Sequence, residues 1–203
     1  MKRIPKSDFK YKHLMVDLET LGLRSTSVIL SIGAVMFNIE TGEASKQDFD
    51  RFHCVIDIDD SLNHGLTIDA ITLRWWLNKS KEAKESLNGN TNLAMALYNF
   101  DQFLYRTQYE TISALKIAHF DYRDEVIVWG NSAKFDLGIL ANAYNVCGKD
   151  KPWRDKNERD VRTLASLRPD IKKECKFEGT KHNPIDDCLH QIKYCSEIWN
   201  KIH

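Results

Sequence analysis

The sequence lacks the features that would place it in a membrane or in an oxidising compartment. Among its 203 residues, no apolar run approaches the roughly 18 residues that a membrane-spanning helix needs, and no apolar signal-type block follows the N-terminus. The five cysteines are odd in number and show no C-x-x-C spacing, so neither a zinc site nor a disulfide framework is indicated. We therefore expect a soluble, cytoplasmic protein with reduced thiols and no membrane partner.

The sequence also lacks a net charge, because 29 Lys and Arg balance 29 Asp and Glu. Nucleic-acid-binding domains are usually strongly basic, so the sum alone argues against such a partner. The charges are unevenly placed, however, and basic residues gather within residues 2–12 and 149–162, where they could follow a phosphate backbone. The balance therefore does not decide the substrate.

Hydrophobic periodicity predicts an α/β fold with one mixed sheet. Residues 13–58 resemble an antiparallel meander of three strands, the second over residues 28–37 and the third over residues 52–58. The remaining elements are helices at residues 68–77 and 93–105, a short buried strand at 126–129, a helix at 135–144, a charged connection at 146–160 and a last helix from residue 185. A length near 200 fits one domain, here residues 13–203, preceded by a basic N-terminal tail, residues 1–12.

Two carboxylates interrupt the first predicted strand. Asp17 and Glu19 are two residues apart, so their side chains point to the same face of a strand, with Cα atoms about 6–7 Å apart. The adjacent Val16 and Leu18 are apolar and should face the core. Like charges side by side repel each other unless a cation lies between them, although an exposed sheet edge often carries the same D-x-E pattern.

Three further residues lie at the ends of predicted elements. Asp136 follows the buried strand at 126–129, and the carboxyl end of a strand is where α/β proteins generally place their sites. An acid at a helix start is also favoured electrostatically, which offers a purely structural explanation. Asn183 is a plausible cap of the last helix, with His182 just before it and Asp187 in its first turn.

Together, four acids and one histidine occupy three separated segments. Four carboxylates that converge without a metal would repel one another prohibitively, and oxygen-only ligands select hard cations. Two such ions stabilise the attacking and leaving oxygens of a phosphodiester displacement, while a histidine outside the ligand set is suited to deprotonate the attacking water. We therefore predict two Mg²⁺ or Mn²⁺ ions as cofactors. The predicted catalytic residues are Asp17, Glu19, Asp136, His182 and Asp187.

These residues resemble the motifs of a known superfamily. The segments Asp17-x-Glu19-Thr20, Asn131-Ser-Ala-Lys-Phe135-Asp136 and His182-x-x-x-x-Asp187 are similar to those of the DEDDh 3′–5′ exonucleases. The resemblance covers roughly residues 13–200 and is strongest to the bacterial and phage exodeoxyribonuclease VIII-like exonucleases and RNase AS-type (Rv2179c-like) ribonucleases. It implies a ribonuclease H-like fold with a mixed five-stranded sheet flanked by helices.

The resemblance also implies a role for each position. Asp17 would bridge both metals, with Glu19 and Asp187 completing one site. Asp136 would help to hold the other metal, and His182 would be the general base. A pocket for the terminal nucleotide would involve Thr20, Leu21, Gly22, Leu23, Asn131, Phe135 and Trp75.

Two positions depart from the family pattern, because Pro184 and Cys188 stand where alanine is common. Proline is tolerated in a first helical turn, and a cysteine beside leucine on a helix face is expected in the core rather than as a nucleophile. Trp75 and Trp76 cannot both face one pocket, since adjacent helix residues point about 100° apart. We expect one of them in the core, and we expect Trp129 to serve in packing.

The primary hypothesis is an enzyme, a metal-dependent 3′–5′ exonuclease that releases 5′-mononucleotides from the 3′ end of single-stranded DNA or RNA. The alternatives are a non-catalytic nucleic-acid-binding module of the same fold and a metal-dependent phosphohydrolase of free nucleotides. The choice between DNA and RNA depends on contacts to the 2′-hydroxyl, which the spacing does not reveal. A homodimer is compatible with the sequence but not required by it.

Overall fold

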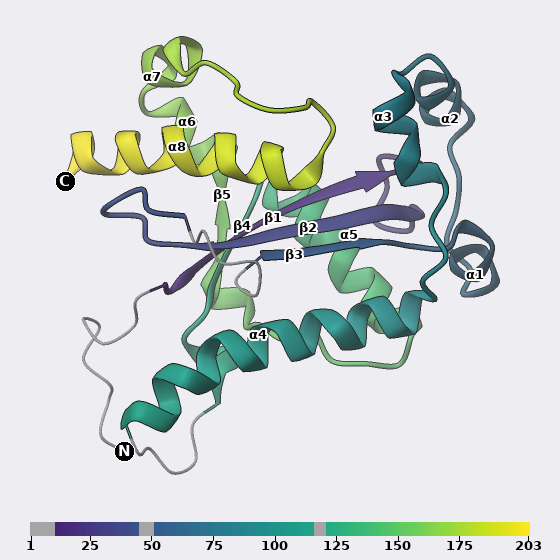
Figure 1. Cartoon of the computed structure of the whole chain (residues 1–203), viewed down its shortest axis with the longest axis horizontal. Helices are drawn as coiled ribbons and strands as arrows, with labels where there is room; N and C mark the ends of the chain where they lie inside the picture. The colour runs from purple at the N-terminus through teal and green to yellow at the C-terminus, as the bar shows by residue number, and fades with distance from the viewer. Residues whose placement is uncertain (1–10, 45–50, 116–120) are drawn as a thin grey trace.

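A computed structural model describes residues 11–44, 51–115 and 121–203. These residues form a five-stranded sheet with helices on both faces (Figure 1), which confirms the predicted α/β class. The strand order is β3-β2-β1-β4-β5; β1, β2 and β3 are antiparallel neighbours, whereas β4 and β5 continue the sheet in parallel with β1. The strands are β1 (His13–Thr20), β2 (Ile29–Phe37), β3 (Arg51–Val55), β4 (Ile127–Gly130) and β5 (Glu158–Asp160).

Eight α-helices and three short 3₁₀ helices lie between and after the strands within the described residues. The α-helices are α1 (Ile58–Asn63), α2 (Ala70–Leu77), α3 (Lys81–Lys84), α4 (Leu93–Leu115), α5 (Ala133–Val146), α6 (Val161–Ser166), α7 (Pro169–Glu174) and α8 (Pro184–Ile202). The 3₁₀ helices are η3 (Glu85–Leu87), η4 (Tyr122–Asp124) and η5 (Asp155–Asn157). Among the described residues, no helix is long and apolar enough to cross a membrane.

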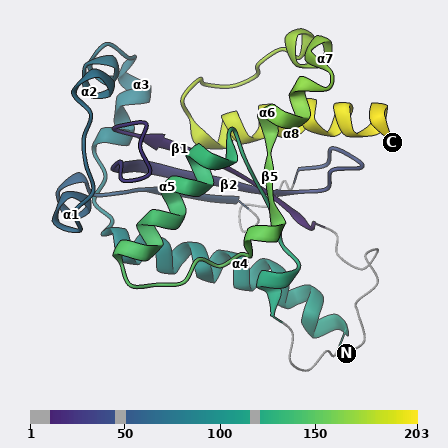
Figure 2. The same ribbon diagram turned by 180° about the vertical axis from the view of Figure 1, so that it is seen from behind.

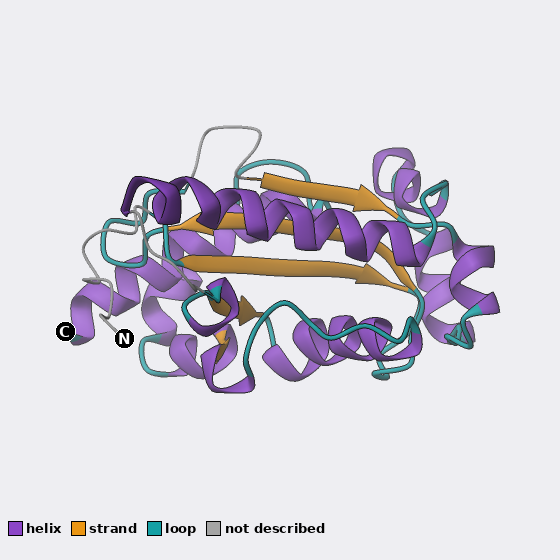
Figure 3. Cartoon of the chain, turned by 90° about the horizontal axis from the view of Figure 1, so that it is seen from below, coloured by secondary structure: helices purple, strands orange, loops and turns teal. Residues whose placement is uncertain are grey.

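The sheet separates two hydrophobic cores. Leu14, Val16 and Leu18 of β1 belong to the core that contains residues of α4 and α5. Met15, which points to the opposite face, belongs to the core formed with α6 and α8. Figure 1 shows α8 above the sheet and α4 below it, Figure 2 shows α5 and β5 from behind, and Figure 3 shows a long helix across the lower face. The period-2 pattern therefore directs Asp17 and Glu19 toward the side covered by α8.

Several predicted boundaries change in the structure. The third strand ends at Val55 rather than at residue 58, because the side chain of Asp57 accepts a hydrogen bond from the Asp60 backbone and caps α1. The predicted connection at 146–160 contains β5, an edge strand of three residues that pairs with β4. The predicted tail at residues 1–12 lies outside the described residues, apart from its last two positions.

The predictions for the tryptophans and for Cys188 are confirmed. Trp76 is buried while Trp75 is exposed, so only one of the pair is in the core. Trp129 is buried and donates from Nε1 to His13 Nδ1 at 2.9 Å. Cys188 is fully buried within the α8 core, and burial raises the pKa of its thiol well above its usual value, which makes it a poor nucleophile.

Candidate active site

The first turn of α8 approaches the sheet closely because a glycine lies beneath it. Gly33 of β2 pairs with Asp17, and a Cβ atom at Gly33 would lie only 2.5 Å from the Cβ of Pro184. Next to this contact, the Cys188 thiol lies 3.5 Å from the Met15 carbonyl oxygen and 3.7 Å from that of Gly33. The close approach brings Asp187 next to the acids of β1.

Side-chain caps fix the start of α8. The Asn183 carboxamide oxygen accepts from the backbone N–H groups of Ile185 and Asp186 at 3.0 and 3.3 Å, and Pro184 occupies the first turn, as predicted. The Asp186 carboxylate accepts from Thr180 N at 2.8 Å and thereby holds the preceding loop. His182 adopts a positive φ of 65°, and its backbone N–H donates to Asp187 Oδ2 at 3.0 Å. The cap therefore orients both His182 and Asp187.

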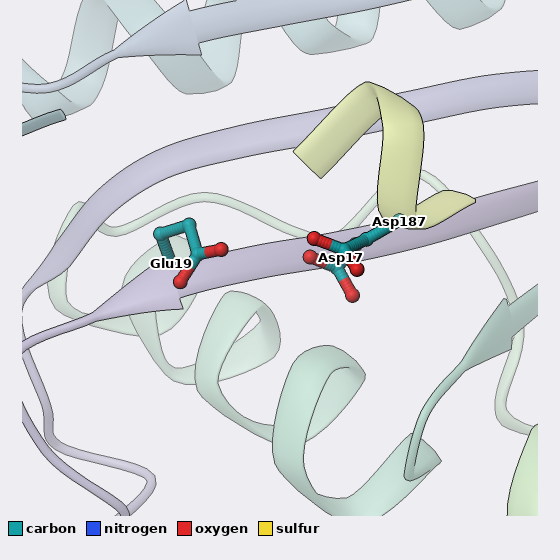
Figure 4. A group of neighbouring side chains, drawn as sticks. All are labelled: Asp17, Glu19 and Asp187. Atoms are coloured by element: carbon teal, nitrogen blue, oxygen red, sulfur yellow. The ribbon is translucent and has the colours of Figure 1, made fainter. Parts of the chain in front are cut away.

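Asp17, Glu19 and Asp187 converge at this point. Each offers one carboxylate oxygen, and these three oxygens lie within 4.8 Å of one another. Figure 4 shows the first two side chains on β1 and the third on α8. Such a set of carboxylate oxygens has the chemistry of a Mg²⁺ or Mn²⁺ site.

Asp136 reaches the same region from the first turn of α5 and is 2% exposed. Its Oδ1 accepts from the backbone N–H of Leu18 at 3.2 Å, and its Oδ2 accepts from that of Asn131 at 2.7 Å. A hydrogen bond therefore links Asp136 to Leu18, between Asp17 and Glu19 on β1. Asp136 is not, however, one of the three residues whose oxygens all lie within 4.8 Å of one another. This separation is compatible with the predicted role at a second metal.

The four acids are held together without a basic side chain to neutralise them. Burial raises the pKa of Glu19 to about 8, that of Asp136 to about 7 and that of Asp187 to about 6. Burial and the neighbouring acids also raise the pKa of Asp17. Within the described parts of the chain, no Lys or Arg forms an ion pair with any of the four carboxylates. The cluster therefore favours bound protons or divalent cations, and the metal that the sequence predicts fits it.

His182 lies at the edge of this acid cluster. Its Nδ1 is 3.8 Å from Glu19 Oε1, and its side chain is one-third exposed. Its ring stands edge to face against Trp75, with centroids 4.9 Å apart. Partial burial, together with the positive charges of Lys79 and Lys181, lowers the pKa of His182. A neutral imidazole that can accept a proton is thus favoured at neutral pH.

Gln191 is a site residue that the sequence analysis missed. It lies one helical turn after Asp187 on α8 and is 3% exposed. Its Nε2 donates to Asp17 Oδ1 at 2.8 Å, whereas its buried Oε1 has no hydrogen-bond partner among the described residues. The i, i+4 spacing from Asp187, on a face with the buried Cys188 and Ile192, is the sequence signal that could have identified it.

The residues predicted to form a nucleotide pocket separate into exposed and buried groups. Leu23 is 78% exposed and Trp75 42% exposed, so both side chains are accessible. Leu21 packs in the core, and its backbone N–H and carbonyl already bond to Val28 and Asp69. The remaining members, Thr20, Gly22, Asn131 and Phe135, are buried or partly buried and lie within five residues of Glu19 or Asp136 in the sequence. A cavity of about 190 Å³ adjoins His182 on the side of β3, α3 and η3, and leaves room for a ligand beside the histidine.

Three of the six basic residues in the segment 149–162 form ion pairs within the described chain. Lys151 pairs with Asp155 and with Glu158, the latter at 2.6 Å, and Arg154 pairs with Asp121 and Asp124 at 2.9 and 3.1 Å. Lys156 also lies 3.7 Å from Asp124. These three residues are therefore paired within the chain, whereas the path predicted for a phosphate backbone along the rest of the segment stays a prediction.

Comparisons with known proteins agree with this geometry. Residues 12–199 match the family described as the 3′–5′ exoribonuclease Rv2179c-like domain. No curated protein sequence is similar enough to count as a relative.

Solved structures of similar fold share little sequence with the chain. The Mg²⁺- and Mn²⁺-bound form of S. pombe Pop2p matches with a TM-score of 0.58 at 13% identity, over 93% of this chain and 82% of that chain. The nuclease domain of 3′hExo, a DEDDh family member bound to rAMP, matches with a TM-score of 0.57 at 11% identity, over 94% of this chain and 93% of that chain. The zinc-bound E. coli ExoI–ssDNA complex matches with a TM-score of 0.53 at 15% identity, over 93% of this chain and 39% of that chain. These likenesses confirm the predicted fold class, a ribonuclease H-like mixed five-stranded sheet flanked by helices.

Proposed function

The chain belongs to the family of Rv2179c-like 3′–5′ exoribonuclease domains, and from this premise we propose that it is a metal-dependent exonuclease that removes 5′-mononucleotides from the 3′ end of single-stranded RNA. The observation that carries the proposal is the convergence of Asp17, Glu19 and Asp187 beside Asp136 and His182. The family description favours RNA, as does the rAMP bound to 3′hExo. Because ExoI, a protein of similar fold, was solved in complex with ssDNA, single-stranded DNA is the substrate to compare with RNA.

We propose that two divalent ions occupy the site, by analogy with the metals of Pop2p. Asp17, Glu19 and Asp187 would hold one ion with their converging oxygens, and Asp17 and Asp136 would hold the other. When bound, the ions would stabilise charge on the attacking and leaving oxygens of the phosphodiester. The backbone N–H groups of Leu18 and Asn131 keep Asp136 oriented for this role.

His182 would take the proton from the attacking water. Its position outside the converging oxygens leaves its ring nitrogens available, and its lowered pKa keeps it neutral at pH 7. Contact with Trp75 and the hydrogen bond from its backbone to Asp187 restrict where the ring can lie. A general base of this kind contributes about 10²–10⁴-fold to the rate.

The test is digestion of matched single-stranded RNA and DNA oligonucleotides labelled at the 3′ end, with Mg²⁺, Mn²⁺ or EDTA. We expect release of labelled mononucleotide from RNA with either metal and none in EDTA. Asp136→Ala should abolish release while the circular dichroism spectrum stays native. Asp121→Ala, which removes a carboxylate outside the site, should retain release.

Other outcomes would favour the alternative functions. Oligonucleotide binding with no turnover in either metal would indicate a non-catalytic binding module. Release of phosphate from nucleoside triphosphates, with no action on the polymer, would indicate a nucleotide phosphohydrolase. Undiminished digestion by Asp136→Ala would contradict the assignment of the site.

We also propose that residues 13–203 form one catalytic domain, because residues of β1 and α8 at opposite ends of the chain pack in the same core. Within the DEDDh exonucleases, we place it nearest to the exodeoxyribonuclease VIII-like and RNase AS-type enzymes. Deletion of residues 1–10, which keeps the hydrogen bond from Ile127 N to the Lys12 carbonyl, should leave the digestion rate unchanged, and a loss of digestion would extend the domain into the deleted segment.

A further inference from the structure

The C-terminal end of α2 presents a lysine to the active site. Trp75 and Lys79 are four residues apart, and Lys79 lies just beyond the helix, where its backbone N–H still bonds to the Trp76 carbonyl at 3.0 Å. The Lys79 ammonium lies over the Trp75 ring, 3.6 Å from its centroid, which is within the range of a cation–π contact. The same Trp75 ring contacts His182. The ammonium is thereby held beside the predicted general base.

Lys79 differs from Lys151, Arg154 and Lys156 of the segment 149–162, which form ion pairs with carboxylates. It forms no ion pair with any carboxylate that the structure describes, and it is partly buried. Its charge nevertheless acts on the site: it opposes the rise that burial and the neighbouring acids cause in the pKa of Glu19, and it adds to the effect of burial that lowers the pKa of His182. The contact with Trp75 therefore holds a positive charge beside the site, and that charge remains available to a negatively charged ligand.

The charge balance of the site indicates what this lysine can bind. Four ionised carboxylates carry four negative charges, and two divalent cations would cancel them. The Lys79 ammonium then remains as a surplus positive charge. Each phosphodiester of a nucleic acid strand carries one negative charge, for which an ammonium is a point-charge partner.

We propose that Lys79 is a substrate-binding residue that contacts a phosphate of the strand at the active site, with Trp75 holding its ammonium in place. The inference rests on the proposed nuclease function and adds to it a residue outside the five predicted catalytic positions. It also places a phosphate contact just beyond α2, outside the basic segment 149–162.

The experiment compares Lys79→Met, which keeps the stem and removes the charge, with Lys79→Arg, which keeps the charge. Lys201→Met is the matched control, because it removes a lysine from the last turn of α8, 14 residues beyond Asp187 and thus about 21 Å along the helix. Steady-state digestion of a single-stranded RNA oligonucleotide gives KM and kcat. Binding of the same oligonucleotide is measured at several KCl concentrations, in an Asp136→Asn background that should prevent turnover. The salt slope is the decrease in the logarithm of the binding constant per unit increase in the logarithm of the KCl concentration.

We expect Lys79→Met to raise KM about tenfold, with a much smaller change in kcat, as for loss of one charge-assisted contact. Its salt slope should fall by about 0.7, the value for one phosphate contact on a single strand. Lys79→Arg and Lys201→Met should stay near wild type in both measurements. Melting temperatures should show that all variants fold.

Two results would overturn the inference. An unchanged KM and salt slope in Lys79→Met would mean that the lysine does not touch substrate. A fall in kcat alone, with KM and slope unchanged, would mean that it acts through His182. Both results are distinct from failure of the proposed function, in which the wild-type protein itself would digest no oligonucleotide.

Discussion

Two groups of four carboxylates lie in this protein, and they differ in what neutralises them. The acid cluster consists of Asp17, Glu19, Asp136 and Asp187. The paired network consists of Asp121, Asp124, Asp155 and Glu158, which contact Arg123, Lys151, Arg154 and Lys156. In the paired network, hydrogen bonds from Arg123 and Lys151 lower the pKa values of Asp121 and Asp155. In the acid cluster, burial raises the pKa of every member.

This difference shows how carboxylates that stabilise the fold can be distinguished from carboxylates that bind a ligand. The paired network is complete within the chain and needs nothing from outside. Ionising the carboxylates of the acid cluster destabilises the folded protein, because buried like charges repel one another. A bound cation offsets this destabilisation. Perturbed pKa values in a cluster without basic partners therefore favour a binding site over a surface feature.

The largest expected effect comes from exchanging one carboxylate in each group for its amide. Asp17→Asn should reduce digestion at least about a thousandfold, because metal ions supply several kcal/mol of transition-state stabilisation. It should also raise the melting temperature of the metal-free protein, since the amide needs neither a buried charge nor the proton uptake that the buried carboxylate requires. Asp121→Asn should leave digestion unchanged and lower the melting temperature, because it removes the charge that pairs with Arg123 and Arg154. Calorimetry in EDTA and an RNA digestion assay measure the two effects, and a destabilised, metal-free Asp17→Asn would contradict the proposed repulsion.

The second prediction concerns Gln191, which holds Asp17 through its amide. Gln191→Leu keeps the volume but removes the donor, and loss of such a supporting hydrogen bond typically weakens metal affinity or activity about 10–100-fold. We expect the Mg²⁺ concentration for half-maximal digestion to rise by this amount. Gln102→Leu, on α4 across the sheet, is the control and should leave the Mg²⁺ dependence unchanged. If both variants behave alike, the Gln191 hydrogen bond does not orient Asp17.

The period-2 pattern of the first strand was sufficient to predict which face carries the acids. Asp17 and Glu19 share that face because strand geometry leaves no alternative, and Val16 and Leu18 lie in the opposite core as predicted. The placement of Asp136 and Asp187 at element ends was predicted from capping and strand signals, and the structure brings both to β1. Their catalytic roles remain predictions.

Features that depend on distant parts of the chain could not be predicted from local patterns. The residues of β5 carry no apolar alternation, so only pairing with β4 reveals them as a strand. The basic residues near 154 seemed available for a phosphate backbone because their partners, Asp121 and Asp124, are about 30 positions away. The i, i+4 spacing places Gln191 on the same helix face as Asp187, but its hydrogen bond to Asp17 depends on the approach of α8 to β1.

The third prediction uses pH to separate the two groups. Acids with raised pKa values hold protons in the folded metal-free protein that the unfolded chain releases, so its stability should fall as pH rises from about 5 to about 8. Metal binding should strengthen over the same interval, because the protons no longer compete. Mg²⁺ at about 100 times its dissociation constant adds about 2.7 kcal/mol, or roughly 5–10 °C in melting temperature. We expect this shift near pH 8 and little of it near pH 5.5, in wild type and in Asp121→Asn alike; an equal shift at both pH values would place the metal elsewhere.

The smallest effect is expected from Arg154→Ala in the paired network. Arg154 is 45% exposed and bonds to Asp121 and Asp124, and exposed pairs of this kind contribute at most about 1 kcal/mol. The melting temperature should therefore fall by no more than about 4 °C, and the difference should shrink in high salt because exposed charges are screened. Digestion and the salt slope of RNA binding should match wild type, since Arg154 already has its partners within the chain. If Arg154→Ala instead weakens RNA binding and reduces its salt slope, Arg154 leaves Asp121 and Asp124 to contact the substrate. The paired network would then take part in substrate binding, which contradicts its purely structural role.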